Sequence, residues 1–323
     1  EACRIPSVLF DVREQVLPGS NSMSKASWIS VVGSLNVDLT FRVPSFPAPG
    51  ETLIAAEVVT SFGGKGGNQA VAAKRAGGEV RMIGCLGDDE QAGQYRKRLG
   101  KEGIDCTGVM RTEGRTGVAS IALNDEGENT IIVHPGANLQ LTPAKVEELE
   151  NLFKGSAVTL LQLECPVESV VKAAQLARNA GSLVVLNPSP WNPKVFESDI
   201  PCDILILNEG EAEVMSSGAL AHFLQRGDRT GIVTRGALPT RVFTGGKMEE
   251  VAPPEISPVD TVGAGDTFAG VLAASLAEGR DVLDSVRMAN SAAALATLQQ
   301  GAQEAIPHRD AIVEMVMQHN APS

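Results

Sequence analysis

The run Gly263–Asp266 places small residues directly before a carboxylate, a combination that suits phosphate chemistry. Gly263, Ala264 and Gly265 have almost no side chains, so a ligand can approach their backbone closely. We expect their N–H groups at the start of a helix, where unpaired donors and the helix dipole favour an anion. Asp266 could then take a proton from a hydroxyl that attacks a phosphate. Alternatively, Asp266 only stabilises the first turn of a helix.

Two further polar residues follow the apolar run Trp28–Gly33, which we interpret as a buried strand. Asn36 and Asp38 come at its carboxyl end, where ligands bind in open α/β sheets. Side chains at i and i+2 of an extended chain face the same way, so both could hydrogen-bond one polyol. Without the motifs further along the chain, an Asx turn that closes the strand would be the favoured explanation of the pair.

Three motifs follow one another along the chain. Asn36–Asp38 comes first, Gly63–Ala70 (G-G-K-G-G-N-Q-A) comes second, and Asp260–Gly270 (D-T-V-G-A-G-D-T-F-A-G) comes third. In this order and at this spacing they resemble the motifs of the ribokinase (PfkB) family of sugar kinases. The resemblance extends from about Trp28 to about Ile312. It implies ATP-dependent phosphorylation of the primary hydroxyl of D-ribose.

The resemblance also implies roles for individual residues. Asp266 would be the general base, and the amides of Gly263, Ala264 and Gly265 would stabilise the charge on the transferred phosphoryl group. The residues that would orient the sugar are Asn36, Asp38, Gly64, Lys65, Asn68, Glu164 and Asp266. Those that would contact the nucleotide are Asn208, Thr234, Gly236, Gly265 and Asn290.

Two cations would accompany ATP in such an enzyme. Glu211, four residues into the run Asn208-Glu209-Gly210-Glu211, would act on Mg²⁺ through water. On local sequence alone it could instead be a charge in the first turn of a helix. The resemblance places a K⁺ site at the Asp260 carboxylate and at the backbone of Val262, Ala296, Gly301 and Ala305. Many relatives have Ser at the position of Ala305, so this chain lacks a side-chain ligand there.

Composition limits the class of protein. The chain has 323 residues, of which 43% are hydrophobic, enough for a large core. The net charge of −12 argues against a general nucleic-acid surface, although a local nest of amides can still hold an anion. No apolar run approaches membrane-spanning length. The cysteines show no metal or redox spacing, which predicts reduced thiols in the cytoplasm; they are Cys3, Cys85, Cys106, Cys165 and Cys202.

Apolar strands alternate with helical segments along most of the chain. We expect strands at 28–33, 80–84, 158–163, 183–186, 204–207 and 231–234. We expect helices at 68–75, 90–102, 143–154, 167–180 and 282–299. This order predicts an α/β fold with a mostly parallel central sheet and helices on both faces. Polar residues at the strand ends predict one active-site rim; they are Asn36, Asp38, Glu164, Asn187, Asn208 and Thr234.

Residues 1–22 do not resemble the rest, and we interpret them as an added tail or a disordered extension. Residues 23–323 are expected to form a single ribokinase-like domain. Segments 39–62 and 116–134, the second a hairpin, would build a small β lid on the main sheet. A second subunit's lid could cover its exposed strands, which predicts a homodimer.

Other functions stay open on the same fold. The acceptor could be deoxyribose, a nucleoside or a phosphorylated hexose, although no extra Arg/Lys cluster near Asn36 or Gly64 suits a second phosphate. A non-catalytic sugar or nucleotide sensor is a further alternative, against which Asp266 argues. The chain also departs from the family pattern at Ala237-Leu238-Pro239 and in a short segment between Glu213 and Gly231.

Overall fold

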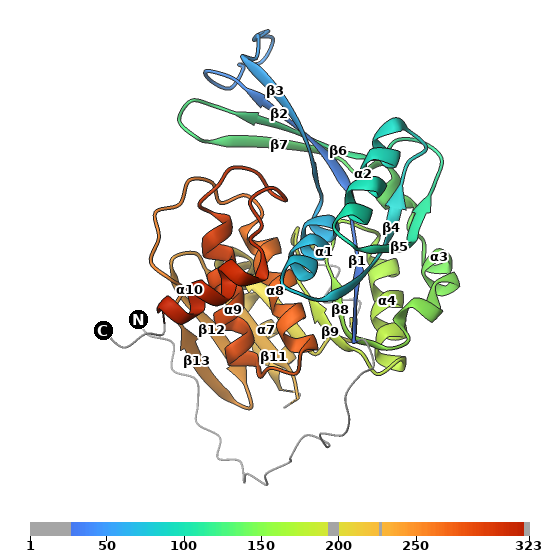
Figure 1. Ribbon diagram of the computed structural model, residues 1–323, viewed down its shortest axis with the longest axis vertical. Helices are drawn as coiled ribbons and strands as arrows, with labels where there is room; N and C mark the ends of the chain where they lie inside the picture. The colour runs from blue at the N-terminus through green and yellow to red at the C-terminus, as the bar shows by residue number, and fades with distance from the viewer. Residues whose placement is uncertain (1–26, 193–199, 226–227, 320–323) are drawn as a thin grey trace.

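The computed structural model describes residues 27–192, 200–225 and 228–319. A nine-stranded sheet forms the body, in the order β13-β12-β11-β10-β9-β8-β1-β4-β5 (Figure 1). The strands from β11 to β5 in this order are parallel, and the β12–β13 hairpin adds an antiparallel edge. Their bounds are β1 Trp28–Val32, β4 Glu79–Leu86, β5 Asp105–Arg111, β8 Ser156–Leu161, β9 Leu183–Leu186, β10 Ile204–Asn208, β11 Thr230–Arg235, β12 Leu238–Thr244 and β13 Lys247–Val251.

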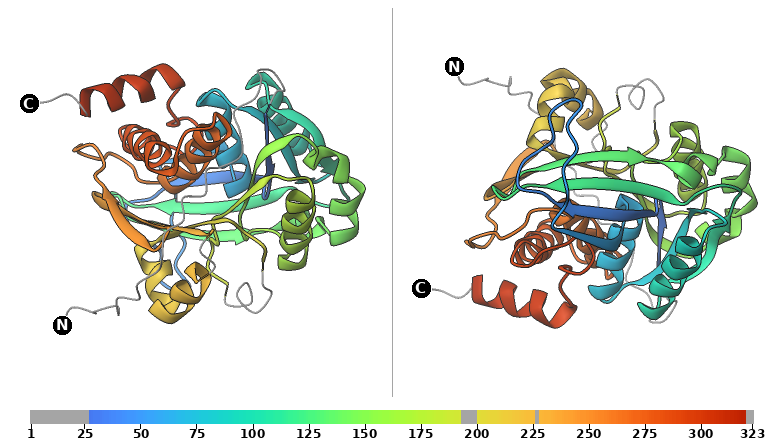
Figure 2. Two further views of the ribbon diagram at one scale, coloured as in Figure 1. Left: turned by 90° about the horizontal axis from the view of Figure 1, so that it is seen from below. Right: turned by 90° about the horizontal axis from the view of Figure 1, so that it is seen from above.

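Helices cover both faces of this sheet, as the two views in Figure 2 show. One face packs against α1 Lys65–Arg75, α2 Glu90–Lys101, α8 Ala264–Ala277, α9 Val282–Ala296 and α10 Arg309–His319. The other packs against α3 Pro143–Glu148, α4 Val167–Asn179, α6 Glu209–Val214 and α7 Ser216–Leu224. Alternation within the strands supplies both cores: Val31 faces the first layer and its neighbour Val32 faces the second. The expected α/β fold is confirmed.

Close packing of α1 against α8 brings two of the predicted motifs together. Residues 66–73 of α1 and 266–275 of α8 are buried, and most of their side chains are small. At the crossing, a Cβ on Gly270 would lie only 2.4 Å from the backbone oxygen of Gln69. Glycine at this position therefore allows the two helix backbones to touch. Their first turns, which carry Asn68 and Asp266, become neighbours as a result.

A second, four-stranded sheet projects from the body (Figure 1). Its order is β3-β2-β6-β7, with bounds β2 Asn36–Arg42, β3 Glu57–Gly63, β6 Gly117–Leu123 and β7 Asn129–His134. The β6–β7 pair is the expected antiparallel hairpin. One surface of this sheet is apolar and open, with Val58 57% and Ile132 71% exposed. Asn36 and Asp38 belong to β2 itself, because the chain enters the small sheet immediately after β1.

Several expected boundaries were wrong. The helix predicted over 143–154 ends at Glu148 and continues as a 3₁₀ helix over Glu150–Phe153. The helix predicted over 282–299 ends at Ala296, because the Thr297 carbonyl turns to accept hydrogen bonds from the Val259 and Asp260 amides. The helix α1 begins at Lys65 rather than at 68. Several elements were not predicted from the sequence; they are β5, β12, β13, α6, α7 and α10. Of α8, only the start was predicted.

Some expectations concern residues or properties apart from the sheets. Residues 1–22 and Cys3 lie outside the described part of the chain. Cys85, Cys106 and Cys165 are free thiols. Within the described ranges, no helix combines the length and the apolar character that a membrane crossing requires.

Candidate active site

Asp266 lies at the third position of α8, with 7% of its surface exposed. Its carboxylate accepts two hydrogen bonds from α1, at 2.9 Å from Asn68 Nδ2 and at 3.0 Å from Gln69 Nε2. These donors come from a different helix, so the carboxylate is fixed by the tertiary packing of α1 on α8. A held carboxylate with remaining lone pairs is suited to accept a proton from a nearby hydroxyl.

The orientation of the Gln69 amide is itself determined by its neighbours. Gln162, at the end of β8, donates from Nε2 to Gln69 Oε1 at 2.6 Å. The Gln69 NH₂ group must therefore face Asp266, and it also lies 3.3 Å from Asn187 Oδ1. Neither Gln69 nor Gln162 is among the site residues expected from the sequence. Gln69 lies within the Gly63–Ala70 motif and Gln162 directly follows β8, but no spacing in the sequence marks either amide as a support for Asp266.

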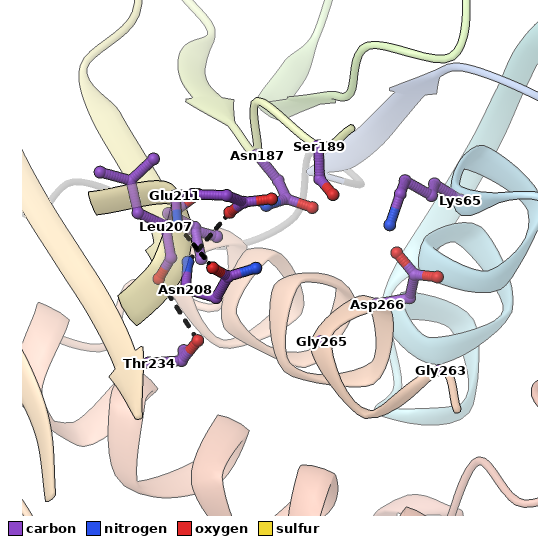
Figure 3. A pocket seen from close by; sticks show the side chains of 11 residues that line it. Lys65, Asn187, Ser189, Leu207, Asn208, Glu211, Thr234, Gly263, Gly265 and Asp266 are labelled. Atoms are coloured by element: carbon purple, nitrogen blue, oxygen red, sulfur yellow. Dashed lines mark hydrogen bonds between the residues drawn. The ribbon is translucent and has the colours of Figure 1, made fainter. Parts of the chain in front are cut away.

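A polar cavity of about 130 Å³ opens beside Asp266 (Figure 3). It brings together residues from the second and third motifs and from the ends of β10 and β11. Its lining is Lys65, Asn187, Ser189, Ile206, Leu207, Asn208, Glu211, Thr234, Gly263, Gly265 and Asp266. The predicted rim residues Asn187, Asn208 and Thr234 thus meet at one place. Asn187 was expected at this rim without an assigned role, and Ser189 was not expected from the sequence.

Lys65 points from α1 toward Asp266 in this cavity (Figure 3). The Asp266 carboxylate is the main reason that the pKa of Lys65 is raised, with Glu164 and Glu211 contributing and burial opposing. The lysine is therefore a firmly charged cation among carboxylates. It lines the same cavity as Asn208 and Glu211, so its charge is also available to an anionic ligand there, and the sugar contact expected from the sequence stays a prediction.

The start of α8 supplies backbone donors to the same cavity. Gly263 is its N-cap, with φ 78°, and a Cβ there would lie 3.1 Å from Ala302 Cα. A Cβ on Gly265 would meet nothing within 4 Å, so that position leaves room for a ligand. The Ala264 amide already donates to Thr261 O at 3.3 Å. Of the three amides expected to bind an anion, those of Gly263 and Gly265 are therefore the better donors.

Glu211 and Asn208 form a capping box at the start of α6. Asn208 Oδ1 accepts from the Glu211 amide at 2.7 Å, and Glu211 Oε2 accepts from the Asn208 amide at 3.0 Å. This geometry holds Glu211 at the cavity wall while its second carboxylate oxygen stays available. In the described parts of the chain, no three His, Cys, Asp or Glu residues cluster as a metal site. A single carboxylate fits Mg²⁺ held mainly by water and phosphate oxygens.

A second cavity, of about 350 Å³, adjoins the first and shares Thr234 and Gly265 with it. Its wall is mostly apolar, and it includes Gly236, Pro253, Pro254, Ile256, Phe268, Ala293 and Ala294. Asn290 also lines it, but both ends of this amide are engaged inside the protein. Oδ1 accepts from Thr240 Oγ1 at 2.8 Å, and Nδ2 donates to Val251 O at 3.0 Å. Asn290 therefore ties α9 to β12 and β13 at the cavity wall.

Asp38 is a buried carboxylate, 9% exposed, for which no hydrogen bond appears among the described residues. Burial raises its pKa to about 7, with further contributions from Glu164, Glu304 and Asp266. The carboxylate lies against the backbone of Gly63, since a Cβ on that glycine would be 1.9 Å from Asp38 Oδ2. Burial of a carboxylate without a hydrogen-bond partner disfavours its charged form, so Asp38 is a candidate ligand-binding group.

The other residues expected at the sugar surround the start of α1. Glu164 Oε2 accepts from the Lys65 amide at 3.0 Å and from Ser34 Oγ. Asn36 Oδ1 accepts from Asn138 Nδ2 at 2.8 Å. Gly64 is the N-cap of α1, with φ 84°. Two of these partners, Ser34 in a loop and Asn138 in the 3₁₀ helix Gly136–Gln140, were not found from the sequence, because isolated polar residues carry no distinctive pattern.

Asp260 joins the two loops expected to bind K⁺. Its Oδ1 accepts from the Val262 amide and its Oδ2 from the Gly301 amide, each at 3.0 Å. Ala296 is the last residue of α9, where helix carbonyls lack partners within the helix. Ala305 is 5% exposed. Asp260 thus brings Val262 and Gly301 of the expected set together, and the K⁺ site itself stays a prediction.

Comparison with known proteins places this geometry in a family. Residues 27–309 match the pfkB family of carbohydrate kinases. The chain is 35% identical over 299 residues to ribokinase of Haemophilus influenzae, covering 89% of this chain and 98% of the relative. It is 32% identical over 291 residues to deoxyribokinase of Salmonella typhi, covering 86% and 95%.

Solved structures agree with the sequence comparison. Ribokinase of Thermotoga maritima superimposes with a TM-score of 0.81 at 32% identity, covering 89% of this chain and 98% of that one. Arabidopsis thaliana ribokinase, solved with ribose and ATP, gives a TM-score of 0.78 at 28% identity, covering 90% and 99%. The chain therefore belongs to the pfkB family of carbohydrate kinases and is an ATP-dependent sugar kinase.

Proposed function

We propose that this kinase transfers the γ-phosphoryl group of ATP to the primary (5-) hydroxyl of D-ribose, giving ribose 5-phosphate and ADP. The observation that carries this proposal is the Asp266 carboxylate, held by Asn68 and Gln69 between the phosphate-sized cavity and the polar residues of β2 and α1. The ribokinase relatives and the ribose complex of the Arabidopsis protein support ribose as the acceptor.

Asp266 acts as the general base in this proposal. It accepts the proton of the sugar hydroxyl as that oxygen forms its bond to the γ-phosphorus, while the bond to the β-phosphate oxygen breaks and ADP leaves. The Gly263 and Gly265 amides, with that of Ala264, stabilise charge on the phosphoryl oxygens. Lys65 neutralises phosphate charge from the opposite wall of the cavity. The apolar cavity accepts the adenine, with Asn290 as part of its wall.

Asn36, Asp38, Gly64, Asn68 and Glu164 orient the sugar in this proposal. Asp38 and Asn68 have acceptor oxygens without a hydrogen bond among the described residues, so both can pair with sugar hydroxyls. The small sheet, which carries Asn36 and Asp38 on β2, acts as a lid that excludes water as a competing acceptor. Residues 23–323 form the one functional domain that includes this lid.

Two cations complete the proposed site. Glu211 holds a water-coordinated Mg²⁺, which supplies charge neutralisation on the phosphates when bound. Asp260 and its neighbouring carbonyls hold K⁺, so K⁺ is expected to activate. Equal rates in K⁺ and in a bulky organic cation at matched ionic strength would contradict the K⁺ site. Rates that do not depend on Mg²⁺ would contradict the role of Glu211.

A homodimer through the small sheet, in the cytoplasm, belongs to the same proposal. The open apolar surface that includes Val58 and Ile132 motivates the dimer. A monomeric mass in light scattering at working concentration would contradict it. The free thiols Cys85, Cys106 and Cys165 motivate the location, which fractionation of the source cells would test.

The acceptor is the part of the proposal that most needs an experiment. Deoxyribose is the main competitor, since the Salmonella typhi relative is a deoxyribokinase. Initial rates with ATP, Mg²⁺ and a panel of ribose, 2-deoxyribose, fructose and a nucleoside decide the question. The highest kcat/KM for ribose supports the proposal. A higher value for another acceptor changes the substrate while leaving the kinase chemistry in place, and no turnover with any sugar would favour a sensor.

A further inference from the structure

Tyr95, the only tyrosine in the chain, lies on α2 and is completely buried. Its hydroxyl donates to Gly63 O at 2.5 Å and accepts from Gln303 Nε2 at 2.8 Å. Its ring stacks on Phe62, with 4.6 Å between the ring centroids and 28° between the planes. The tyrosine therefore contacts two consecutive residues at the end of β3, one through its ring and one through its hydroxyl.

Gly63 is the junction at which the small sheet meets the body. It ends β3, and the next residue, Gly64, is the N-cap of α1 with φ 84°. The Asp38 carboxylate lies directly on its backbone, because a Cβ there would be 1.9 Å from Asp38 Oδ2. A Cβ on Gly67, one turn into α1, would be 1.9 Å from the Tyr95 hydroxyl. The phenol thus supports the backbone on which the proposed sugar contacts Asp38 and Asn68 depend.

Gln303 connects the phenol to a firmly anchored turn. Arg75 Nη1 donates to Gln303 O at 2.8 Å and to Ile306 O at 2.7 Å. The same guanidinium pairs with Glu102 at 2.7 Å, with both side chains about nine-tenths buried. The amide of Gly301, two residues before Gln303, donates to Asp260 Oδ2. A rigid segment that packs against the body therefore fixes the position of the Tyr95 hydroxyl.

We propose that Tyr95 is a positioning residue for the sugar site, acting through the Gln303–Tyr95–Gly63 hydrogen-bond chain that joins the 301–306 turn to the base of the small sheet. This inference rests on the proposed function, because it assigns Asp38 and Asn68 to the sugar. Tyr95 touches no reacting atom. It sets the β3–α1 junction so that Asp38 on β2 and Asn68 on α1 face one acceptor at the same time.

Tyr95→Phe isolates the hydroxyl, since the ring and its stacking on Phe62 stay in place. Loss of one buried hydrogen bond predicts an increase in KM for the acceptor of about tenfold, with KM for ATP unchanged within about twofold. A purely structural role would instead lower the melting temperature and the fraction of active enzyme, while KM for both substrates stays at the wild-type value. That second result would overturn the proposal.

Gln303→Leu provides a second variant at the other end of the chain. It should raise KM for the acceptor in the same direction by a smaller factor, because the phenol keeps its bond to Gly63 O. The double variant should show no more than the effect of Tyr95→Phe alone, since both changes interrupt one chain. Additive effects on KM would contradict a shared path. Both variants are measured with the acceptor that the wild-type enzyme prefers, so a change of substrate does not affect the outcome.

The single tyrosine also permits a test by binding alone. Replacing it with 3-fluorotyrosine gives one ¹⁹F resonance in the full chain. We expect that resonance to shift when the preferred acceptor is added and to stay in place when a non-hydrolysable ATP analogue is added. A resonance that responds to neither, or to the nucleotide alone, would contradict the proposal. Saturable calorimetric binding of the same acceptor shows independently that the sugar site itself is occupied.

Discussion

The two ends of the active site differ in how they present themselves to a ligand. The proposed sugar end contains the polar side chains Asp38, Asn68, Glu164 and Asp266. Asn68 donates to Asp266 and Glu164 accepts from the Lys65 amide, whereas Asp38 is buried with no hydrogen bond among the described residues. The proposed nucleotide end is the mostly apolar cavity of about 350 Å³, in whose wall the buried Asn290 amide is hydrogen-bonded to the protein. A polar end can discriminate by pairing or failing to pair hydroxyl groups, whereas an apolar end discriminates by shape.

Only the proposed sugar end lowers the stability of the ligand-free protein. Asp38 is buried without a hydrogen bond among the described residues, and its pKa is raised to about 7, so its charge destabilises the ligand-free fold. Apolar groups such as Ala293 and Ala294, in the cavity of about 350 Å³ that we propose for the adenine base (the base cavity), impose no such penalty. The comparison therefore predicts that changes at the sugar end alter turnover and stability strongly, and that changes in the nucleotide base alter rates weakly.

The largest effect is expected from Asp266→Asn. The substitution keeps size and polarity but removes the base, so kcat should fall by roughly two to four orders of magnitude while both substrates still bind. Single-turnover rates with saturating ribose and ATP measure this. A matched control is Asp284→Asn, because Asp284 occupies the same third position of α9 but is exposed. If Asp266 only stabilised a helix, the two variants would both retain nearly full kcat.

The next effect concerns acceptor choice. Asp38→Ala should lower kcat/KM for ribose by about 10- to 100-fold, the scale of one or two lost hydrogen bonds in a buried site. If Asp38 binds the 2-hydroxyl, 2-deoxyribose should already be a poor substrate of the wild type and should lose little more. Thr40→Ala, two residues further along the same face of β2, is the control and should leave both values near wild type. Equal losses for the two sugars would assign Asp38 to another hydroxyl.

The residues of the polar end were also easier to predict from the sequence than those of the apolar end. Asn36, Asp38, Asn68 and Asp266 occur in motifs whose spacing implies a role, and the structure brings them around the α1–α8 contact. The parallel sheet and its covering helices followed from alternating apolar segments. The residues that hold these groups, such as Gln162 and Tyr95, could not be predicted, because their partners lie tens or hundreds of positions away in the chain.

Few of the residues that line the base cavity could be predicted from the sequence. Its wall comes from a connector around Pro253–Ile256, from β12 and the turn before it, and from one side each of α8 and α9. Apolar residues on a helix face are indistinguishable from ordinary core, so only the tertiary structure shows that they leave a space. The role of Asn290 illustrates the limit: the sequence placed it near the nucleotide, whereas its hydrogen bonds reveal why its amide is held there.

The cost of the buried Asp38 charge should be measurable as stability. A carboxyl whose pKa is raised in the folded state binds more protons folded than unfolded between about pH 4 and 7. The free energy of unfolding therefore falls as pH rises through this window, and the penalty is complete above pH 7. Asp38→Asn removes the charge, so it should stabilise the sugar-free protein by about 1–3 kcal/mol more at pH 8 than at pH 5. Denaturant unfolding at both pH values checks this, and a pH-independent difference would contradict it.

The smallest effect is expected at the nucleotide end. The cavity of about 350 Å³ is lined mainly by apolar side chains, and the Asn290 amide already has one partner at each end, so we expect no side-chain amide to read the edge of the base. A pocket without such a reader rejects an altered polar edge only weakly. ITP, which exchanges the 6-amino group of adenine for an oxygen, should therefore keep kcat and raise KM by less than about tenfold, or ~1.4 kcal/mol. A decrease in kcat/KM of more than about a thousandfold with ITP would mean that backbone groups of the 253–256 connector hydrogen-bond to the edge of the base in the closed complex. In that case the two ends of the site would both select by hydrogen bonds, and they would differ only in whether side chains or main chain supply them.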